Sequence, residues 1–297
     1  DQSSEQTPVT ASVVVPVRNG ERVIARCLRS LSLQDLPRDD YEIIVVDDGS
    51  TDATAEIVRQ FPRVCLIVQP PSGPAAARNR GAEAAHGDMV LFTDADCVPA
   101  GDWLGEVAEA MSDPAVQIVI GSHQFGGRGL LLSMLAAYEE GKKEYTYNSP
   151  IKVLYHGHNN NMAVRKRLFD EIGAFVERPR GADTIFVRRC VDQYGCSAVR
   201  HNPGMRVRHL EINSVYKYYS KCSVYRRSRR AYRPMAFVRG LTNRERLLVF
   251  RRTVRNQGYS LAEAMLLFAL LTVGLTHCTL RSYLPGLERG MGKRRRA

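Results

Sequence analysis

Two aspartates separated by one small residue, Asp94 and Asp96, carry the clearest chemical signal in the chain. They follow residues 89–93, a run of large or β-branched side chains with no polar alternation, which is typical of a strand buried on both faces of a parallel sheet. Side chains two positions apart in an extended segment point the same way. Both carboxylates are therefore expected to project just beyond the carboxyl end of the strand, where open α/β sheets bind ligands.

Two carboxylates this close repel each other unless a cation lies between them. Hard oxygen ligands favour Mg²⁺ or Mn²⁺ shared with a phosphate, so we interpret the segment from Asp94 through Ala95 to Asp96 as a metal and diphosphate site. An aspartate cap in a turn, before the helix expected from residue 102, is the alternative. The spacing alone does not separate the two interpretations.

The elements around this segment alternate between strand and helix, which indicates an α/β fold with a mostly parallel central sheet flanked by helices. Apolar runs that end in Pro, Gly, Asp or Ser mark the strands, and helical spacing of apolar residues marks the helices. Strands are expected at residues 12–17, 41–47, 64–68, 89–93 and 116–121, and helices at residues 21–36, 53–61, 75–87 and 102–111.

Three more candidate residues lie on these and later elements. Arg78 lies on the small-residue helix 75–87, from which its fork of donors can reach a diphosphate or stay solvated on the surface. Asp183 opens a helix predicted at residues 184–194, where an acid is also favoured simply by the helix dipole. His209 ends a strand-like segment, where a packed histidine is one interpretation. The remaining expected elements are a helix at 130–145, extended segments at 152–165, 197–200 and 205–210, and a helix at 214–232.

The net charge of +11 is distributed very unevenly. Residues 1–200 hold 21 basic and 27 acidic side chains, whereas residues 201–297 hold 21 and 4, so the net charges are −6 and +17. Residues 261–280 are the one apolar stretch that approaches the roughly 20 residues needed to span a bilayer. A basic block beside such a stretch indicates an anionic membrane surface. Nucleic acid, held by the tyrosines and bases of residues 214–233, is the alternative partner, and a core or oligomer helix is the alternative role for residues 261–280.

The seven cysteines are odd in number and scattered, without zinc-ligand spacing. This favours a reducing compartment over a disulfide framework, so we expect a cytoplasmic protein. Residues 1–8 are polar and patternless, which predicts a flexible lead-in without a signal peptide.

Four separated motifs, V-V-P-V-R-N-G-E, I-V-V-D-D-G-S-T-D, A-R-N-R-G-A-E-A-A-H-G-D and F-T-D-A-D, resemble in order and spacing the nucleotide-sugar half of glycosyltransferase family 2. The resemblance covers about residues 9–125 and continues more weakly to about residue 210. It implies a GT-A fold and single-displacement, inverting transfer from a nucleoside diphosphate sugar. By position, it implies a nucleotide-sugar pocket lined by Pro16, Val17, Arg18, Asn19, Glu21, Asp48, Arg78, Asp94, Ala95 and Asp96.

The same resemblance implies individual roles. Asp48 accepts a hydrogen bond from the base, and Asp96 is the principal metal ligand, with Asp94 nearer the ribose or a metal-bound water. His209 is a further ligand to metal or phosphate, Asn161 lies on the acceptor side, and Asp183 is the catalytic base. Ala182 departs from the family pattern, because a Glu commonly precedes that Asp.

We therefore expect a flexible segment at 1–8, a catalytic domain at 9–212 with a donor half (9–125) and an acceptor half (126–212), and a basic helical, membrane-associated region at 213–297. The predicted function is Mg²⁺- or Mn²⁺-dependent transfer of a sugar from a UDP- or GDP-sugar to a glycan or lipid-linked glycan. The protein is expected to associate with the cytoplasmic membrane surface peripherally or monotopically, with no nucleic-acid partner, and to be able to form a homo-oligomer. The alternatives are an inactive scaffold of this fold, a basic membrane- or nucleic-acid-binding module, and a sugar-nucleotide pyrophosphorylase, although P-V-R-N-G-E-R is poor in glycine for that last class.

Overall fold

The computed structural model describes residues 10–232 and 237–283, and the expected lead-in at 1–8 lies outside them. One eight-stranded sheet forms the centre, in the order β3-β2-β1-β4-β7-β6-β8-β5. All strands except β7 and β5 run in the same direction, so the predicted α/β class with a mostly parallel sheet is confirmed. The strands are β1 (Ala11–Val17), β2 (Tyr41–Asp47), β3 (Val64–Val68), β4 (Met89–Thr93), β5 (Cys97–Pro99), β6 (Ile118–Phe125), β7 (Asn161–Arg165) and β8 (Val199–His209).

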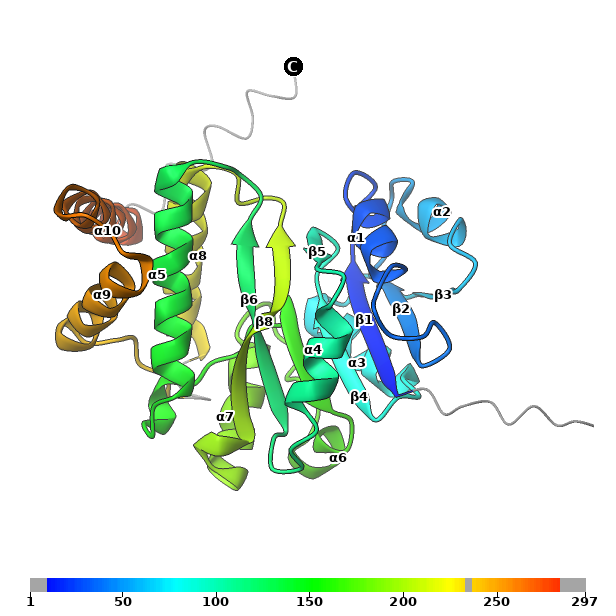
Figure 1. Cartoon of the computed structure of the whole chain (residues 1–297). Helices are drawn as coiled ribbons and strands as arrows, with labels where there is room; N and C mark the ends of the chain where they lie inside the picture. The colour runs from blue at the N-terminus through cyan, green and yellow to red at the C-terminus, as the bar shows by residue number, and fades with distance from the viewer. Residues whose placement is uncertain (1–9, 233–236, 284–297) are drawn as a thin grey trace, which may run out of the picture.

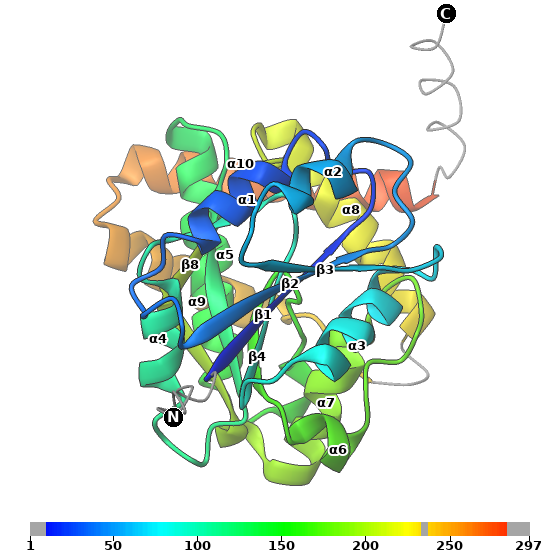
Figure 2. The ribbon, with the colours of Figure 1, turned by 90° about the vertical axis from the view of Figure 1, so that its right-hand side faces the viewer.

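Helices cover both faces of this sheet (Figures 1 and 2). One apolar core joins the sheet to α1 and α4, and a second joins the opposite face to α3 and α7. Strands buried on both sides need apolar residues at every position, which is why β1 and β4 lack polar alternation. The helices are α1 (Ile24–Leu31), α2 (Thr54–Arg59), α3 (Pro74–Ala84), α4 (Trp103–Ala110), α5 (Leu130–Tyr147), α6 (Leu168–Ile172), α7 (Ala182–Tyr194), α8 (Val215–Tyr232), α9 (Asn243–Gln257) and α10 (Leu261–Tyr283).

The second half of the sheet differs from the sequence prediction in three places. Only residues 161–165 of the predicted extended segment 152–165 form a strand, and residues 152–154 form a 3-10 turn instead. The two strand-like segments at 197–200 and 205–210 are one strand, β8, whose pairing with β6 shifts register between Gly121 and Ser122. Strand β5 was not predicted, since its three residues pair only with β8, far away in sequence.

The C-terminal helices pack against α5 on the side of the molecule away from β3 (Figure 1). Met134 of α5 contacts a cluster with Val249 of α9 and Leu267 of α10, and Leu135 packs with Tyr218 and Tyr219 of α8. The packing of α8 thus buries two of the tyrosines that would be needed to stack on bases. The predicted domain boundary after residue 212 falls between β8 and α8 and stays a prediction.

Helix α9 was not predicted, although its start carries a signal. Thr242 accepts a hydrogen bond from the backbone of Glu245, whose side chain returns to the backbone of Thr242, and this capping box is recognisable as T-x-x-E. Helix α10 includes Leu261–Thr279, a stretch long and apolar enough to cross a membrane, of which only 6% is buried. Exposed side chains on it include Leu261, Met265, Phe268 and Val273.

Candidate functional site

The loops that follow β1 and β2 bind each other at the carboxyl edge of the sheet. The backbone N–H of Asn19 donates to Oγ of Ser50 at 2.8 Å, and Oδ1 of Asn19 accepts from the N–H of Thr51 at 2.9 Å. Asn19 has a positive φ of 52°, a conformation that asparagine tolerates better than most residues. The predicted pocket residues Pro16 and Val17 lie in β1 beneath this loop, while the side chain of Glu21 accepts from the N–H of Ala53.

Asp48 is buried and organises the next loop. Its carboxylate accepts hydrogen bonds from Nε2 of Gln69 at 2.8 Å and from the N–H groups of Ser72 and Gly73 at 2.7 and 2.9 Å. Gly49 has φ 73°, and a Cβ there would lie 2.6 Å from Pro71, so only glycine fits this turn. The two loops and Asp48 form the floor on which the predicted nucleotide pocket would rest.

The segment Asp94–Asp96 is a turn between β4 and β5, so the two carboxylates have different partners. Oδ1 of Asp94 lies 2.5 Å from a guanidinium nitrogen of Arg78, which is largely buried. Oδ2 of Asp96 lies 3.4 Å from Nδ1 of His209. The structure therefore brings α3, β4 and the end of β8 together at one point of the sheet edge.

Within the described residues, Asp96, Cys97 and His209 form a cluster whose potential metal-ligand atoms all lie within 4.8 Å of one another. Asp94 is not part of it. Nδ1 of the buried His209 makes no hydrogen bond among the described residues, and a buried, unbonded nitrogen facing a carboxylate is the pattern of an open ligand position. Burial raises the pKa of the Cys97 thiol, and the nearby carboxylates raise it further, so Cys97 stays protonated and is a poor ligand.

Burial also dominates the electrostatics of the other two groups. It raises the pKa of Asp96, an effect that His209 opposes and Asp94 reinforces. It lowers the pKa of His209, against the attraction of Asp96. A neutral imidazole beside a carboxylate suits a divalent cation, because a metal ligand nitrogen must be unprotonated.

Asp183 is the second residue of α7. The residue that precedes the helix, Gly181, has a φ of 83° in the left-handed region. Oδ1 of Asp183 accepts from the N–H of Thr184 at 2.8 Å. Burial raises its pKa against three opposing contacts, the N–H of Thr184, the charge of Arg78 and the backbone of Asn159. Asp183 is thus within electrostatic reach of the Arg78–Asp94 pair.

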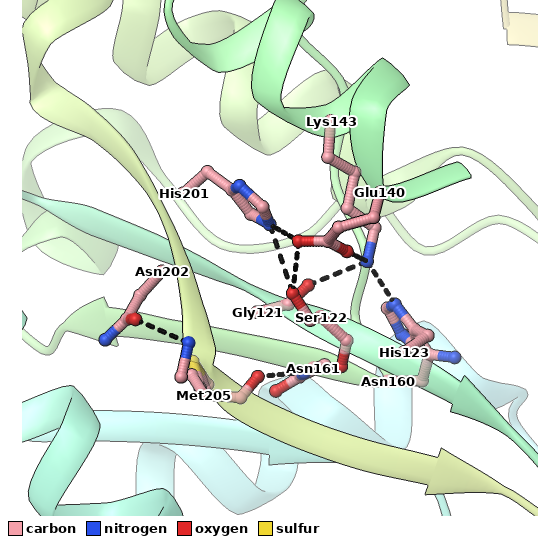
Figure 3. A network of polar contacts seen from close by, with 11 residues as sticks. Gly121, Ser122, His123, Glu140, Lys143, Asn160, Asn161, His201, Asn202 and Met205 are labelled. Atoms are coloured by element: carbon pink, nitrogen blue, oxygen red, sulfur yellow. Dashed lines mark hydrogen bonds and ion pairs between the residues drawn. The ribbon is translucent and has the colours of Figure 1, made fainter. Parts of the chain in front are cut away.

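Asn161 lies inside the fold, whereas the family resemblance implied a position on the acceptor side. It is fully buried in β7, where its Nδ2 donates to the carbonyls of Ser122 and Met205 and its Oδ1 accepts from the indole N–H of Trp103. Figure 3 shows this side chain next to Met205 of β8, to which it is hydrogen-bonded. Because these bonds join three separate parts of the fold, Asn161 is placed to hold strands together rather than to meet an acceptor.

A polar network beside Asn161 was not anticipated from the sequence (Figure 3). Lys143 of α5 donates to the carbonyl of Gly121 at 2.9 Å and to Nδ1 of His123 at 2.7 Å. Glu140 lies 2.9 Å from Nε2 of His201. Burial opposes ionisation of Glu140, but His201, Lys143 and a hydrogen bond from Ser122 outweigh it and lower its pKa to about 2.

This network reaches the site through the loop before β7. An ammonium can only donate, so Nδ1 of His123 accepts from Lys143 and its Nε2–H donates to Oδ1 of Asn160, 2.8 Å away. The carbonyl of Asn160 accepts from the hydroxyl of Thr93, the residue before Asp94. The adjacent Asn159 contacts Asp183, so the network fixes a loop that contacts Asp183 and the residue before Asp94.

Two residues of α8 at the site were also missed. Nζ of Lys221 lies 3.0 Å from Nε2 of His209, and Tyr225, one turn later, is close enough to Asp94 and Asp183 for both to raise its pKa. The sequence showed only a helix with interleaved tyrosines and bases, and nothing in it said which face would meet β8.

Known proteins resemble this chain in sequence. The profile of the family described as Glycosyl transferase family 2 matches residues 12–173. Glycosyltransferase AglE of Haloferax volcanii is 31% identical over 191 residues, which cover 61% of this chain and 61% of that protein. Poly(ribitol-phosphate) beta-N-acetylglucosaminyltransferase TarS of Staphylococcus aureus is 34% identical over 129 residues, 41% of this chain and 22% of its own length. The chain thus spans less than two thirds of the length of these relatives.

Solved structures share the fold. Mannosyltransferase PcManGT from Pyrobaculum calidifontis, in complex with GDP-Man and Mn²⁺, superposes with a TM-score of 0.58 at 22% identity, over 94% of this chain and 87% of that one. S. aureus TarS 1-349 in complex with UDP superposes with a TM-score of 0.54 at 21% identity, over 84% of this chain and 72% of that one. At these identities the likeness concerns the fold alone, and it matches the predicted GT-A class.

Proposed function

The chain belongs to glycosyltransferase family 2, and from this premise we propose that it transfers a sugar from a nucleoside diphosphate sugar to an acceptor hydroxyl with inversion at the anomeric carbon. One observation carries the proposal: Asp96 with His209, Arg78 with Asp94, and Asp183 meet at a single edge of the sheet. These groups supply what the reaction needs, namely positive charge for a leaving diphosphate and a base for the acceptor.

The donor would bind over the loops after β1 and β2. Asp48 presents a buried carboxylate already ordered by three donors, and the base of UDP or GDP can donate a ring N–H to its remaining lone pairs. Arg18 and Asn19 lie in the facing loop, with Glu21 bound to the second loop. Arg78 offers a guanidinium that is now held by Asp94, in reach of ribose or diphosphate.

Asp96 and His209 would hold the divalent cation. Their donor set, one carboxylate oxygen and one unbonded imidazole nitrogen, fits Mn²⁺ better than Mg²⁺, because Mg²⁺ prefers an all-oxygen shell. Asp94 lies beside them, nearer Arg78. When bound, the cation supplies charge neutralisation for the diphosphate.

Asp183 would act as the base. Its pKa is raised by burial, and a base of higher pKa accepts a proton more readily. The acceptor hydroxyl gives its proton to Asp183 as its oxygen bonds to the anomeric carbon, and the bond from that carbon to the diphosphate breaks with both electrons leaving on the diphosphate. Inversion needs only this one base.

The C-terminal helices would hold the site near a membrane. Helix α10 exposes Leu261, Met265 and Phe268, and α9 exposes Leu247 and Leu248 among several arginines. Apolar side chains rimmed by bases fit the interface of an anionic bilayer, which on the cytoplasmic side would present a glycan or lipid-linked glycan acceptor. A second copy of the chain is the competing occupant of this face.

A panel of nucleoside diphosphate sugars tests the proposal. Thermal stabilisation by one donor in the presence of Mn²⁺, lost on addition of a chelator and in Asp96→Ala, is the expected result. A protein that is stabilised by none of UDP-, GDP- or other nucleotide sugars, with or without Mn²⁺, would contradict the assignment.

A further inference from the structure

Lys221 of α8 lies at the edge of the Asp96–His209 pair, where its ammonium has two partners. Its Nζ lies 3.0 Å from Nε2 of His209 and 3.0 Å from Oε2 of Glu211. The side chain is 30% exposed, and its positive charge acts on Asp96 as well. It is therefore a cation next to the expected diphosphate position that the family motifs do not include.

Both contacts of Lys221 are easily exchanged. Glu211 is 58% exposed, and an ion pair that solvent reaches in this way contributes little to stability. The lysine stem is long and flexible, and its ammonium donates in any of three directions. Moving Nζ away from Glu211 toward a more highly charged anion therefore costs little.

The contact between Lys221 and His209 would also have to break if a cation were bound. Nε2 of His209 must accept from Lys221, because an ammonium has no acceptor, so the ring proton is on Nδ1, which faces Asp96. A ring that binds a cation through Nδ1 carries its proton on Nε2 instead, and it can then no longer accept from Lys221. Occupation of the Asp96–His209 position and the present Lys221–His209 bond exclude each other.

The face of α8 that carries Lys221 lies beside the site over two helical turns. Tyr225 is four residues further on, hence on the same side of the helix. It is 54% exposed, yet the carboxylates of Asp94 and Asp183 act on its hydroxyl, as does the guanidinium of Arg180. Tyr225 is thus both open to solvent and close to these groups, so this face of α8 is accessible beside the site.

We propose that Lys221 is a further donor-binding residue, whose ammonium leaves His209 and Glu211 to bind the diphosphate of the nucleotide sugar. This rests on the function proposed above. As the bond between the anomeric carbon and the diphosphate breaks, its electron pair adds negative charge to the phosphate that departs, and Lys221 neutralises that charge. The first residues of the C-terminal third thereby belong to the catalytic site as well as to the membrane-facing helices.

Binding measurements on the full chain test this inference. Calorimetry with Mn²⁺ present first establishes which of UDP and GDP the unaltered protein binds, and the corresponding monophosphate is then compared. Lys221→Met is expected to weaken diphosphate binding by about tenfold or more while monophosphate binding changes less than about twofold. Lys221→Arg, which keeps the charge, is expected to stay within about threefold of the unaltered protein.

Two controls separate direct contact from a structural effect. Lys217→Met removes an exposed lysine one turn earlier on α8 and should leave both affinities unchanged. Titration with Mn²⁺ alone should show that Lys221→Met binds the ion no more weakly than the unaltered protein, since a nearby positive charge has been removed. If Lys221 instead served only to orient His209, Mn²⁺ affinity would fall together with nucleotide affinity.

The outcomes distinguish this inference from the function on which it rests. An unaltered protein that binds neither diphosphate contradicts the proposed function. An unaltered protein that binds a diphosphate, with Lys221→Met binding it equally well or losing monophosphate and diphosphate alike, overturns the role of Lys221 alone.

Discussion

The two sides of the site are built in different ways. On the donor side, backbone N–H groups in the loops after parallel strands donate to side-chain oxygens of the neighbouring loop, as Asn19 donates to Ser50 and Gly73 to Asp48. On the opposite side, charged side chains that are distant in sequence meet in the interior, as Glu140 meets His201. The first arrangement is encoded within a few residues of each strand end, whereas the second exists only once the whole sheet has formed.

The largest effect is expected where the second side supplies the chemistry. Asp183→Asn keeps the shape of the side chain but removes the base, so transfer should fall by about 10²–10⁴-fold while donor binding stays within about twofold. Steady-state kinetics and calorimetry on the same preparation measure the two quantities. Retention of full transfer would remove Asp183 from the mechanism.

The pH profile sharpens this prediction. Asp183 accepts a proton only when ionised, and burial raises its pKa above the usual 3.8. Activity should therefore decline as pH falls through that raised value, with an acid limb at higher pH than an ordinary aspartate gives. The residual activity of Asp183→Asn should lack this limb, and an unchanged limb would assign it to another group.

A substitution on the donor side should lower both the stability of the protein and its affinity for nucleotide. Asp48→Ala leaves Gln69, Ser72 and Gly73 without their acceptor, so the free energy of unfolding should fall by about 2–4 kcal/mol and nucleotide binding should be lost. Chemical denaturation measures the first. Asp39→Ala is the matched control, because Asp39 and its partner Arg63 are both largely exposed. Equal stability of the two variants would show that the loop does not depend on Asp48.

The buried network should give the second side a distinct acid sensitivity. Its contacts lower the pKa of Glu140 from 4.5 to about 2. A carboxyl group whose pKa is lower in the folded state than in the unfolded state stabilises the fold at pH values above the unfolded-state pKa. This stabilisation is lost as the pH falls from about 4.5 toward about 2. Glu140→Gln should cost about 2 kcal/mol at neutral pH, less than the full shift implies since a third of the side chain is exposed.

Denaturation curves at neutral pH and within that acid window measure the effect. The stability difference between Glu140→Gln and the unaltered protein should shrink in acid. Glu83→Gln, an exposed carboxylate on the donor side, should change neither quantity. A constant difference at all pH values would mean that Glu140 is not stabilised as an ion.

The smallest expected effect concerns the exposed face of α10. Replacing Met265 and Phe268 by serine should reduce sedimentation with anionic vesicles by about tenfold, without changing nucleotide binding. Leu33→Ser removes an even more exposed apolar side chain from the donor side and should leave sedimentation unchanged. These substitutions are cleaner than deleting α10, because Leu267 of that helix is buried against α5 and α9. Lost self-association with unaltered vesicle binding would assign the face to a second copy.

The same contrast explains what the sequence could predict. The buried strands β1 and β4 and the turn chemistry at Asp48 and Asp94 are local patterns, and the structure has them where the sequence placed them. The structural role of Asn161 could not be predicted. A family motif marks the residue, but it does not show whether the side chain binds a ligand or forms hydrogen bonds within the fold. Strand β5 pairs with β8, and Lys221 contacts His209 at the end of β8. Both contacts depend on the place of β8 in the sheet, which no local sequence pattern predicts.

The most direct test of the account is the position of a divalent cation. A crystal of the full chain grown with Mn²⁺ and a nucleoside diphosphate, measured at the manganese absorption edge, should show an anomalous peak between Oδ2 of Asp96 and Nδ1 of His209, with the diphosphate on its open side. A peak and nucleotide bound in another cleft, with Asp96 and His209 still facing each other, would contradict it.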